Sequence, residues 1–255
     1  MIELIDVSKR FKQVEAVNSL SMRVNRGEIY GFLGPNGAGK TTTLKMIAGT
    51  LKPSSGRIII NGRDVDRNPE AAKQELGFIP DRPFLYEKLT GFEFLQFMAG
   101  LYKVNHDSFS SRSRELLNLF ELSSWEHELV ESYSHGMKQR LIMSAAMLHR
   151  PKALIVDEPM VGLDPRGARL LKKIFRQLRL NGVSILISTH TLSIAADICD
   201  RIGIIHKGRL FTEGTVEELK SQAGGSKHLE EAFLKLTGGN EEQVLTDFFK
   251  SEAKG

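Results

Sequence analysis

The sequence predicts an α/β fold with a mostly parallel sheet, an N-terminal antiparallel β subdomain and an all-helical insert. Three observations support this prediction. Strand and helix patterns alternate in the second half of the chain, apolar residues recur at helical spacing over about residues 88–150, and a glycine-rich turn joins a strand to a helix near residue 34. Strands separated by helices pair in parallel, and the helices cover both faces of the sheet.

The N-terminal part favours strands joined by turns. Alternating or continuous apolar residues predict strands over residues 2–7, 20–24, 28–33 and 57–60. Residues 41–48 have a helical pattern that stops at Gly49, and Asn61-Gly62 is typical of a β-hairpin turn. These elements make up the predicted β subdomain and the first strand and helix of the core.

Helical spacing dominates the middle of the chain, and strands return after Pro151. The predicted helices of the insert cover residues 92–102, 113–122 and 137–149. The following order is strand 153–156, helix 166–180, strand 184–188, helix 192–198, strand 202–206 and a hairpin at Gly208 leading to 210–212. Short helical patterns follow at 216–222, 228–236 and 241–249. We therefore expect one domain over residues 1–220, with a helical subdomain at about 88–150, and a C-terminal helical tail over 221–255.

The composition excludes several classes of protein. No run of about 18 apolar residues predicts a membrane span, and the N-terminus lacks the apolar stretch of a signal peptide, so a membrane role would require a partner. The only cysteine, Cys199, excludes an internal disulfide and a cysteine-based zinc site, and a reducing cytosol is the expected setting. The net charge of +4 is mild and the basic residues are scattered, so no direct nucleic-acid binding is expected.

The strongest functional motif matches GxxxxGK(S/T) between a predicted strand and a predicted helix. Glycines let the backbone turn its N–H groups toward phosphate oxygens at the positive end of the helix. Lys40 would then reach the β- and γ-phosphates of ATP, and the hydroxyl of Thr41 would ligate Mg²⁺. The residues expected to bind ATP here are Gly34, Pro35, Asn36, Gly37, Ala38, Gly39, Lys40, Thr41 and Thr42. The motif predicts a P-loop NTPase core with ATP and Mg²⁺ as its ligands.

Two adjacent carboxylates end the apolar run at residues 153–156. Ligands of α/β sheets bind at the carboxyl ends of the strands. Asp157 would hold Mg²⁺ directly or through water, and Glu158 would orient or deprotonate the attacking water. On its own such a pair is an ordinary polar end of a strand. Beside the glycine-rich loop it predicts a hydrolytic site.

A third segment, residues 133–140, is similar to the LSGGQxQR signature of ABC transporter ATP-binding subunits. The matching residues are Ser134, Gly136, Gln139 and Arg140, and the departing ones are Tyr133, His135 and Met137. A serine cap and a glycine at a helix start form an anion-binding N-terminus, although alone they indicate only an ordinary N-cap. The chain resembles this family over about residues 2–220, and most closely its bacterial export-type (ABC-2-like) members.

The resemblance implies a motor that hydrolyses ATP and drives a separate transmembrane permease, through which it would lie at the cytoplasmic face of the membrane. Two subunits would form a head-to-tail homodimer around two ATP-Mg²⁺. The residues expected at the signature and the dimer interface are Ser134, His135, Gly136, Met137, Gln139 and Asp164, with Ser134 and Gly136 also binding ATP. His190 would join Glu158 and Lys40 as a catalytic residue. Phe11 would stack on adenine, and Val17 would pack beneath the sugar.

Asp81 departs from the family, which usually has Gln after the strand near residues 76–80. The resemblance then implies an oxygen ligand near Mg²⁺, but a neutral amide has become an anion, so changed metal affinity or changed coupling to the permease is expected. The next apolar residues, 83–86, have two interpretations of equal weight. They hold a helix of the permease, or they pack into the core of the insert.

Two other functions remain open from the residues alone. A soluble ABC-type ATPase acting on nucleic acid or ribosomes uses the same motifs, but such relatives generally carry tandem modules, a coiled-coil insertion or zinc cysteines. Salt-dependent binding to DNA or RNA would favour it, whereas co-purification with a membrane protein would favour the transporter. A P-loop kinase or GTPase leaves residues 134–140 and His190 without a role, and the chain has no Asn-Lys-x-Asp motif.

Overall fold

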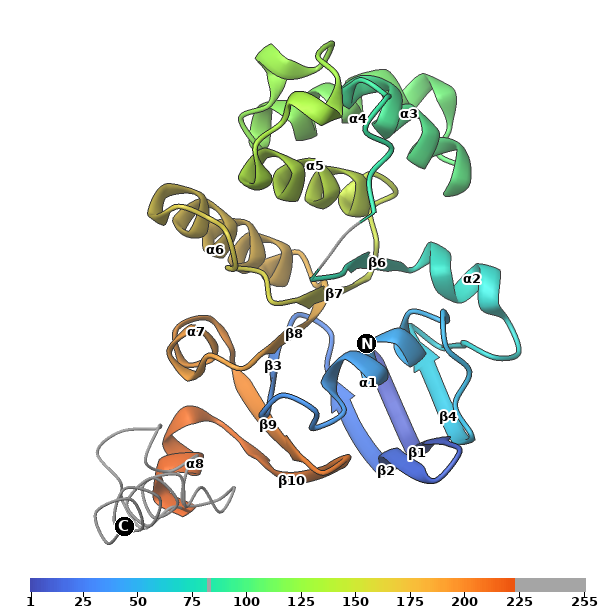
Figure 1. The fold of residues 1–255 in the computed structure, drawn as a ribbon, viewed down its shortest axis with the longest axis vertical. Coiled ribbons are helices and arrows are strands. Elements are labelled where there is room, and N and C mark those ends of the chain that lie inside the picture. The colour runs from blue at the N-terminus through green and yellow to red at the C-terminus, as the bar shows by residue number, and fades with distance from the viewer. Residues whose placement is uncertain (82–83, 223–255) are drawn as a thin grey trace, which may run out of the picture.

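A six-stranded sheet forms the centre of the structure, which is a computed structural model that describes residues 1–81 and 84–222 (Figure 1). The strand order is β10-β9-β3-β8-β7-β6, and only β10 runs antiparallel to its neighbour. The strands are β3 (Ile29–Leu33), β6 (Leu76–Ile79), β7 (Ala153–Asp157), β8 (Ser184–Thr189), β9 (Arg201–His206) and β10 (Arg209–Gly214). Every residue of β3, β7 and β8 is buried, as continuous apolar strands covered on both faces should be. The predicted mostly parallel α/β sheet is confirmed.

A second, antiparallel sheet is formed by the N-terminal part, in the order β2-β1-β4-β5. Its strands are β1 (Ile2–Phe11), β2 (Val14–Val24), β4 (Ser55–Ile60) and β5 (Arg63–Asp64). β1 and β2 are longer than predicted. Register shifts within their pairing break the alternation of buried and exposed residues, so the sequence pattern indicated only part of each strand. The Asn61-Gly62 turn joins β4 to β5 as expected.

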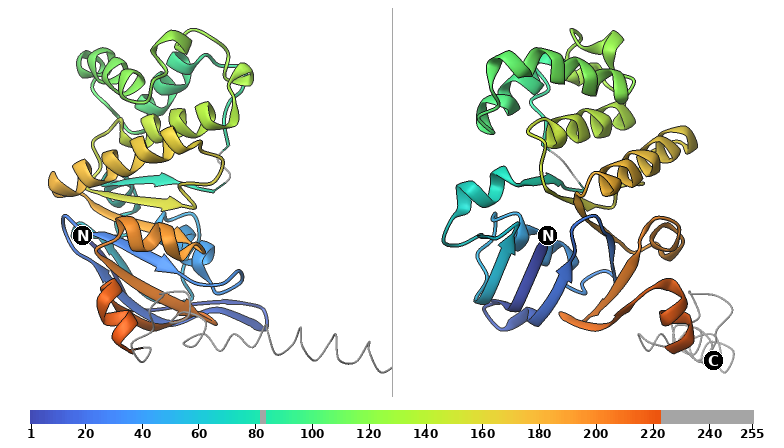
Figure 2. Two further views of the ribbon diagram at one scale, coloured as in Figure 1. Left: turned by 90° about the vertical axis from the view of Figure 1, so that its left-hand side faces the viewer. Right: turned by 180° about the vertical axis from the view of Figure 1, so that it is seen from behind.

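Helix α1 (Lys40–Ile47) lies between the two sheets (Figure 2). Its apolar residues Leu44, Met46 and Ile47 are fully buried and pack in one cluster with residues of β1, β2, β3 and β7. This packing holds the start of α1, and with it the glycine-rich loop, in a fixed place against the central sheet.

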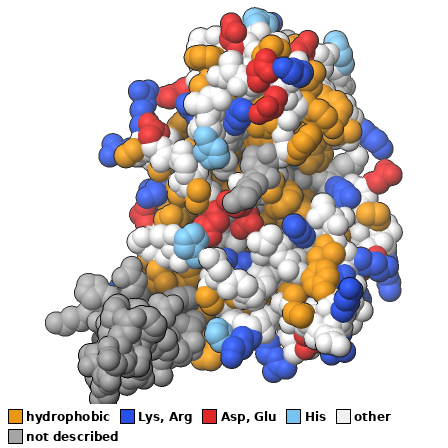
Figure 3. Space-filling model, in the orientation of Figure 1, with side chains coloured by type: hydrophobic (Ala, Val, Ile, Leu, Met, Phe, Trp, Pro, Cys, Tyr) orange, Lys and Arg blue, Asp and Glu red, His pale blue; other side chains and the backbone are white. Residues whose placement is uncertain are grey.

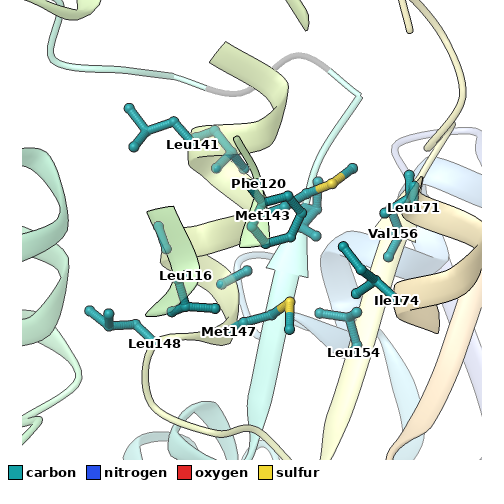
Figure 4. Packing of buried hydrophobic residues seen from close by; sticks show 14 of the residues in the cluster. Leu116, Phe120, Leu141, Met143, Met147, Leu148, Leu154, Val156, Leu171 and Ile174 are labelled. Atoms are coloured by element: carbon teal, nitrogen blue, oxygen red, sulfur yellow. The ribbon is translucent and has the colours of Figure 1, made fainter. Parts of the chain in front are cut away.

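The helical insert consists of α3 (Gly91–Leu101), α4 (His106–Leu119) and α5 (His135–Met147), which lie together beyond β6 and β7 (Figure 1). α4 begins seven residues before the predicted start because Asn105 caps it, its side chain accepting a hydrogen bond from the amide of Asp107 at 2.9 Å. Side chains of α4 and α5 meet those of β7 and α6 (Pro165–Leu180) in one apolar core (Figure 4). The insert therefore packs directly on the core of the domain.

The remaining helices are α2 (Pro69–Gln74), α7 (Leu192–Ile198) and α8 (Val216–Gln222), with short 3₁₀ turns at Ser123–Trp125 and Val130–Ser132. α2 was absent from the sequence prediction because its six residues are too short to show helical spacing. The helices predicted at 228–236 and 241–249 lie outside the described residues, and the division of the chain near residue 220 stays a prediction. None of the helices described is both long and apolar enough to cross a bilayer.

His149, just after α5, makes the stability of the fold depend on pH. Its ring stacks on Tyr102 with centroids 3.8 Å apart, and Nε2 lies 3.1 Å from the carbonyl oxygen of Leu76. Burial lowers the pKa of His149 from 6.5 to about 4, opposed by the hydrogen bond to Leu76. Between these values the unfolded chain binds a proton that the folded chain does not, so stability falls as the pH falls below about 6.5.

We expect the free energy of unfolding to drop by about 1–2 kcal/mol between pH 7 and pH 5 through this group. The measurement is urea unfolding at both pH values for the parent and for His149→Gln, whose loss should be smaller by that amount. His127→Gln, at an exposed ring, is the matched control and should behave like the parent. An equal loss in all three proteins would contradict this role of His149.

Candidate functional site

The parallel register places three strand ends at one edge of the central sheet. β8 lies between β3 and β7, with Leu33 opposite Thr189 and Asp157 opposite Ser188. The glycine-rich loop, Glu158 and His190 follow these three ends directly. Segments separated by more than 100 residues are thereby brought to one place, where α/β sheets bind their ligands.

The glycine-rich loop curls around the ammonium group of Lys40. Its Nζ donates hydrogen bonds to the carbonyl oxygens of Gly34 at 2.6 Å and Pro35 at 3.2 Å. Gly39 has φ +107°, and a Cβ built there would lie 2.5 Å from the carbonyl oxygen of Ala16, so only glycine fits before the helix. Burial lowers the pKa of Lys40, while the negative charges of Glu158 and Asp157 oppose this shift. The ammonium is therefore held beside negative charge in a mostly buried position.

Asp157 lies beside the start of α1. Thr41 Oγ1 donates to Asp157 Oδ2 at 3.4 Å, so two of the three predicted metal ligands present oxygens to one point. Burial raises the pKa of Asp157, and the negative charges of Glu158 and Asp81 raise it further, which indicates that Asp81 lies near. Carboxylates gather near the middle of this face of the molecule (Figure 3).

This set of oxygens fits Mg²⁺ bound together with phosphates. Across residues 1–81 and 84–222, no group of three or more His, Cys, Asp or Glu side chains forms a metal site by itself. Mg²⁺ in nucleotide sites typically takes one or two protein ligands and completes its shell with phosphate oxygens and water. A hydroxyl and a buried carboxylate in contact match that requirement.

Glu158 is held by the segment that follows β8. Its Oε1 accepts a hydrogen bond from the amide of His190 at 3.0 Å and lies 2.7 Å from His190 Nδ1. Its Oε2 accepts a hydrogen bond from Thr189 Oγ1 at 3.0 Å. The Thr189 hydroxyl oxygen in turn accepts a hydrogen bond from the amide of Thr191 at 3.1 Å. The geometry thus brings the predicted base and the predicted histidine together. Thr189 was missed, although its place before His190 at a strand end was the available signal.

The predicted interface residues lie at the starts of two helices. Ser134 caps α5 by accepting from the amide of Met137 at 3.3 Å, and Asp164 caps α6 by accepting from the amide of Gly167 at 2.8 Å. Both caps are exposed. Phe11, at the end of β1, keeps 45% of its surface exposed, with the ammonium of Lys9 5.2 Å above its ring. An exposed aromatic face of this kind is suited to stacking.

The contacts predicted for the side chains of two site residues do not fit their burial in the structure. Val17 is fully buried and packs in the cluster around α1, so it has no surface to offer a sugar. Gln139 is 3% exposed, because its position on α5 turns it toward the core and away from any partner surface. Sequence spacing alone does not tell which face of a short element is covered.

The side chains of residues 84–86 differ in how far they are buried. Phe84 is 79% exposed and Tyr86 is 48% exposed, and these rings stack edge to face with centroids 5.4 Å apart. Tyr86 also stacks on Phe97 of α3 at 5.0 Å. Leu85, in contrast, packs against the core of the insert. The segment therefore presents most of its aromatic surface to solvent.

Comparisons with known proteins agree with this site. The family model described as ABC transporter matches residues 17–161. The linearmycin resistance ATP-binding protein LnrL of Bacillus subtilis (strain 168) is 34% identical over 241 residues, which cover 94% of this chain and 76% of that protein. The daunorubicin resistance ATP-binding protein DrrA3 of Streptomyces coeruleorubidus is 37% identical over 219 residues, covering 86% and 69%.

Solved structures extend the agreement to the fold. An ATP-binding subunit of an ABC transporter superposes with a TM-score of 0.88 at 34% identity, over 93% of this chain and 99% of that one. The ATP-binding cassette MJ0796, solved as a dimer in a post-hydrolysis state with ADP and Pi, superposes with a TM-score of 0.74. At 24% identity, over 84% of this chain and 98% of that one, this second likeness concerns the fold alone.

Proposed function

The chain belongs to the ABC transporter ATP-binding proteins and hydrolyses ATP, and from this premise we propose that two copies close head to tail around two ATP-Mg²⁺ to drive a transmembrane permease. The observation that carries this proposal is the meeting of Lys40, Asp157, Glu158 and His190 at one edge of the sheet. In the proposed assembly the subunit lies at the cytoplasmic face of the membrane, held there by the permease.

The position of the signature segment supports the dimer. Ser134 and Gly136 begin α5 in the helical insert, whereas the glycine-rich loop begins α1 between the two sheets (Figure 1). The Ser134 cap is exposed and offers its helix N-terminus to an anion outside its own subunit. A second copy turned head to tail supplies that anion as the γ-phosphate on its own glycine-rich loop.

Within each site the side chains have separate tasks. Lys40 binds the β- and γ-phosphates in place of the carbonyl oxygens that it now contacts. Glu158 accepts the proton of the attacking water, and Thr189 and His190 orient its carboxylate. Thr41 and Asp157 would hold Mg²⁺ together with the phosphates, where the positive charge of the ion would stabilise the transferring phosphoryl group. Phe11 stacks on the adenine.

The permease docks, in this proposal, on the aromatic surface formed by Phe84, Tyr86 and Phe97. These residues line a groove of about 820 Å³ whose wall also includes Lys88 and the ion pair between Glu87 and Lys138. Exposed apolar surface rimmed by charged side chains is typical of a protein-binding site and unlike the basic, polar surface that binds nucleic acid. The groove therefore favours a transporter over the nucleic-acid alternative.

Export is the proposed direction of transport. Both LnrL and DrrA3 are resistance proteins by name, and a transporter protects a cell from a toxic compound by moving it outward. The identity to these relatives extends over most of this chain, which supports carrying the direction over with the fold.

Glu158→Gln tests the proposed base. We expect ATP binding to be kept and the turnover number to fall by roughly 10²–10⁴, because the amide does not accept the proton. The unhydrolysed ATP should also hold two subunits together, visible as a dimer in size-exclusion chromatography. Glu217→Gln, at an exposed position of α8, is the control and should behave like the parent. Normal turnover in Glu158→Gln would exclude this residue as the base.

Asp81→Asn tests the metal side of the site. Removing a negative charge near Asp157 should raise the Mg²⁺ concentration that gives half-maximal ATPase activity by about two- to tenfold. The measurement is a Mg²⁺ titration at saturating ATP. The control is Asp66→Asn, which changes a surface carboxylate paired with Lys52. An unchanged Mg²⁺ dependence would show that Asp81 takes no part in metal binding.

Alanine at Phe84 and Phe97 tests the docking surface. The double variant should keep the ATPase activity of the isolated subunit but lose co-purification with a membrane protein, because the exposed rings contribute mainly to binding. Phe211→Ala is the matched control, since Phe211 is 52% exposed on β10. Retained co-purification of the double variant, or salt-dependent binding of the parent to RNA or DNA, would count against the proposal.

A further inference from the structure

The two segments assigned to the dimer interface touch each other within one subunit. His135, which stands where the family has glycine, packs its ring directly on Gly162 in the turn before α6. A Cβ built at Gly162 would lie only 2.3 Å from Cδ2 of His135, and Gly162 has φ +76°. Both the backbone conformation at Gly162 and the space left beside it by His135 therefore favour glycine. The start of α5 is in van der Waals contact with the turn that leads to Asp164.

A second contact, through Glu121, joins the same two segments. Its Oε1 accepts a hydrogen bond from Nη2 of Arg166 in the first turn of α6 at 2.8 Å, and its Oε2 lies 3.5 Å from Nη1 of Arg140 on α5. Arg140 in turn donates from Nε to the carbonyl oxygen of Gly136 at 3.4 Å. Ion pairs and hydrogen bonds thus connect the signature segment to α6 through the carboxylate of Glu121.

The backbone of Glu121 indicates that its side chain has a role. The residue follows the C-cap Phe120 of α4 and has φ +57°, a conformation in which glycine is strongly favoured. Lys103 occupies the same position after the C-cap Tyr102 of α3, with φ +54°. Among the residues that the structure describes, the side chain of Lys103 pairs only with the exposed Glu70, at 3.4 Å, so it provides a matched position away from the starts of α5 and α6.

The turn that receives these contacts begins at the proposed base. The amide of Val161 donates to the carbonyl oxygen of Glu158 at 3.2 Å, and the amide of Leu163 donates to the carbonyl oxygen of Met160 at 3.4 Å. Met160 and Leu163 pack against the same apolar core as the insert. A shift of the start of α5 is therefore transmitted to a short, hydrogen-bonded turn that begins at Glu158.

We propose that Glu121 and His135 are positioning residues that tie the signature segment to the Gly162–Asp164 turn, so that ATP bound at the partner's site acts through Ser134 on the position of this subunit's own Glu158. The inference rests on the proposed dimer and adds to it a route by which each site senses the other. Neither residue touches the nucleotide of its own subunit in this arrangement.

The tie itself is tested without nucleotide and without a dimer. Glu121→Gly removes the carboxylate and relieves the backbone, so the variant should fold at least as stably as the parent. Amide hydrogen exchange of residues 159–166 should become faster in Glu121→Gly and in His135→Gly, because each change frees the turn. Lys103→Gly makes the same backbone change elsewhere and should leave these amides unchanged. Parental exchange rates in both test variants would overturn the tie.

Steady-state kinetics test the transmission between sites. The parent should hydrolyse ATP with positive cooperativity, and Glu121→Gly should lower the Hill coefficient toward 1 and the turnover number by about two- to fivefold, the range expected for an exposed ion pair. Lys103→Gly should keep the parental values. Arg166→Gln should change both values in the same direction as Glu121→Gly, and the double variant should lose no more than Glu121→Gly alone, since both substitutions remove the Glu121–Arg166 pair. Parental cooperativity in Glu121→Gly, or additive losses in the double variant, would overturn the proposal.

The two measurements separate this inference from the proposed function. If Glu158→Gln with ATP forms no dimer, the proposed assembly is wrong and the transmission is overturned with it, while hydrogen exchange still decides whether the tie exists. If that dimer forms and Glu121→Gly keeps parental cooperativity, the assembly holds and only the inference fails.

Discussion

The parallel pairing of β3, β8 and β7 is the constraint on which the site depends. Because the three strands run in the same direction with β8 in the middle, their carboxyl ends share one edge. In sequence the glycine-rich loop is more than 100 residues from the two carboxylates and from His190, so only this pairing brings it to them. The constraint is secured on both faces, since apolar side chains of these strands point alternately into the cluster around α1 and into the core shared with α5 and α6.

Burial gives this edge its chemistry. Lys40 and Asp157 are mostly removed from water. Burial lowers the pKa of Lys40 and raises the pKa of Asp157, and each shift disfavours the charged form. Backbone carbonyl groups satisfy the ammonium, and a threonine hydroxyl contacts the carboxylate. A phosphate chain with its cation would replace these weak partners with full opposite charges. The arrangement is thus poised for a ligand that carries both signs, as ATP-Mg²⁺ does.

The same fold separates three surfaces with different tasks. The strand edge carries the residues proposed to bind nucleotide, and the exposed caps Ser134 and Asp164 begin α5 and α6. The aromatic groove beside α3 is the surface proposed to bind the permease. The apolar core of the insert lies between them, because side chains of α5, α6 and β7 belong to one cluster (Figure 4). A displacement at one surface is therefore transmitted toward the others through close-packed side chains.

The sequence by itself determined the parts that are written in consecutive residues: the glycine-rich loop, the acidic end of β7, the serine cap of α5 and the order of strands and helices. These are local, since a turn, a cap or an apolar run depends on neighbours a few residues away. Only the tertiary structure decided that Val17 and Gln139 are buried, that Phe84 is exposed, and that Thr189 and Glu121 have partners at all. Each of these depends on which distant segment packs alongside, and that is settled by sheet order and helix packing rather than by local pattern.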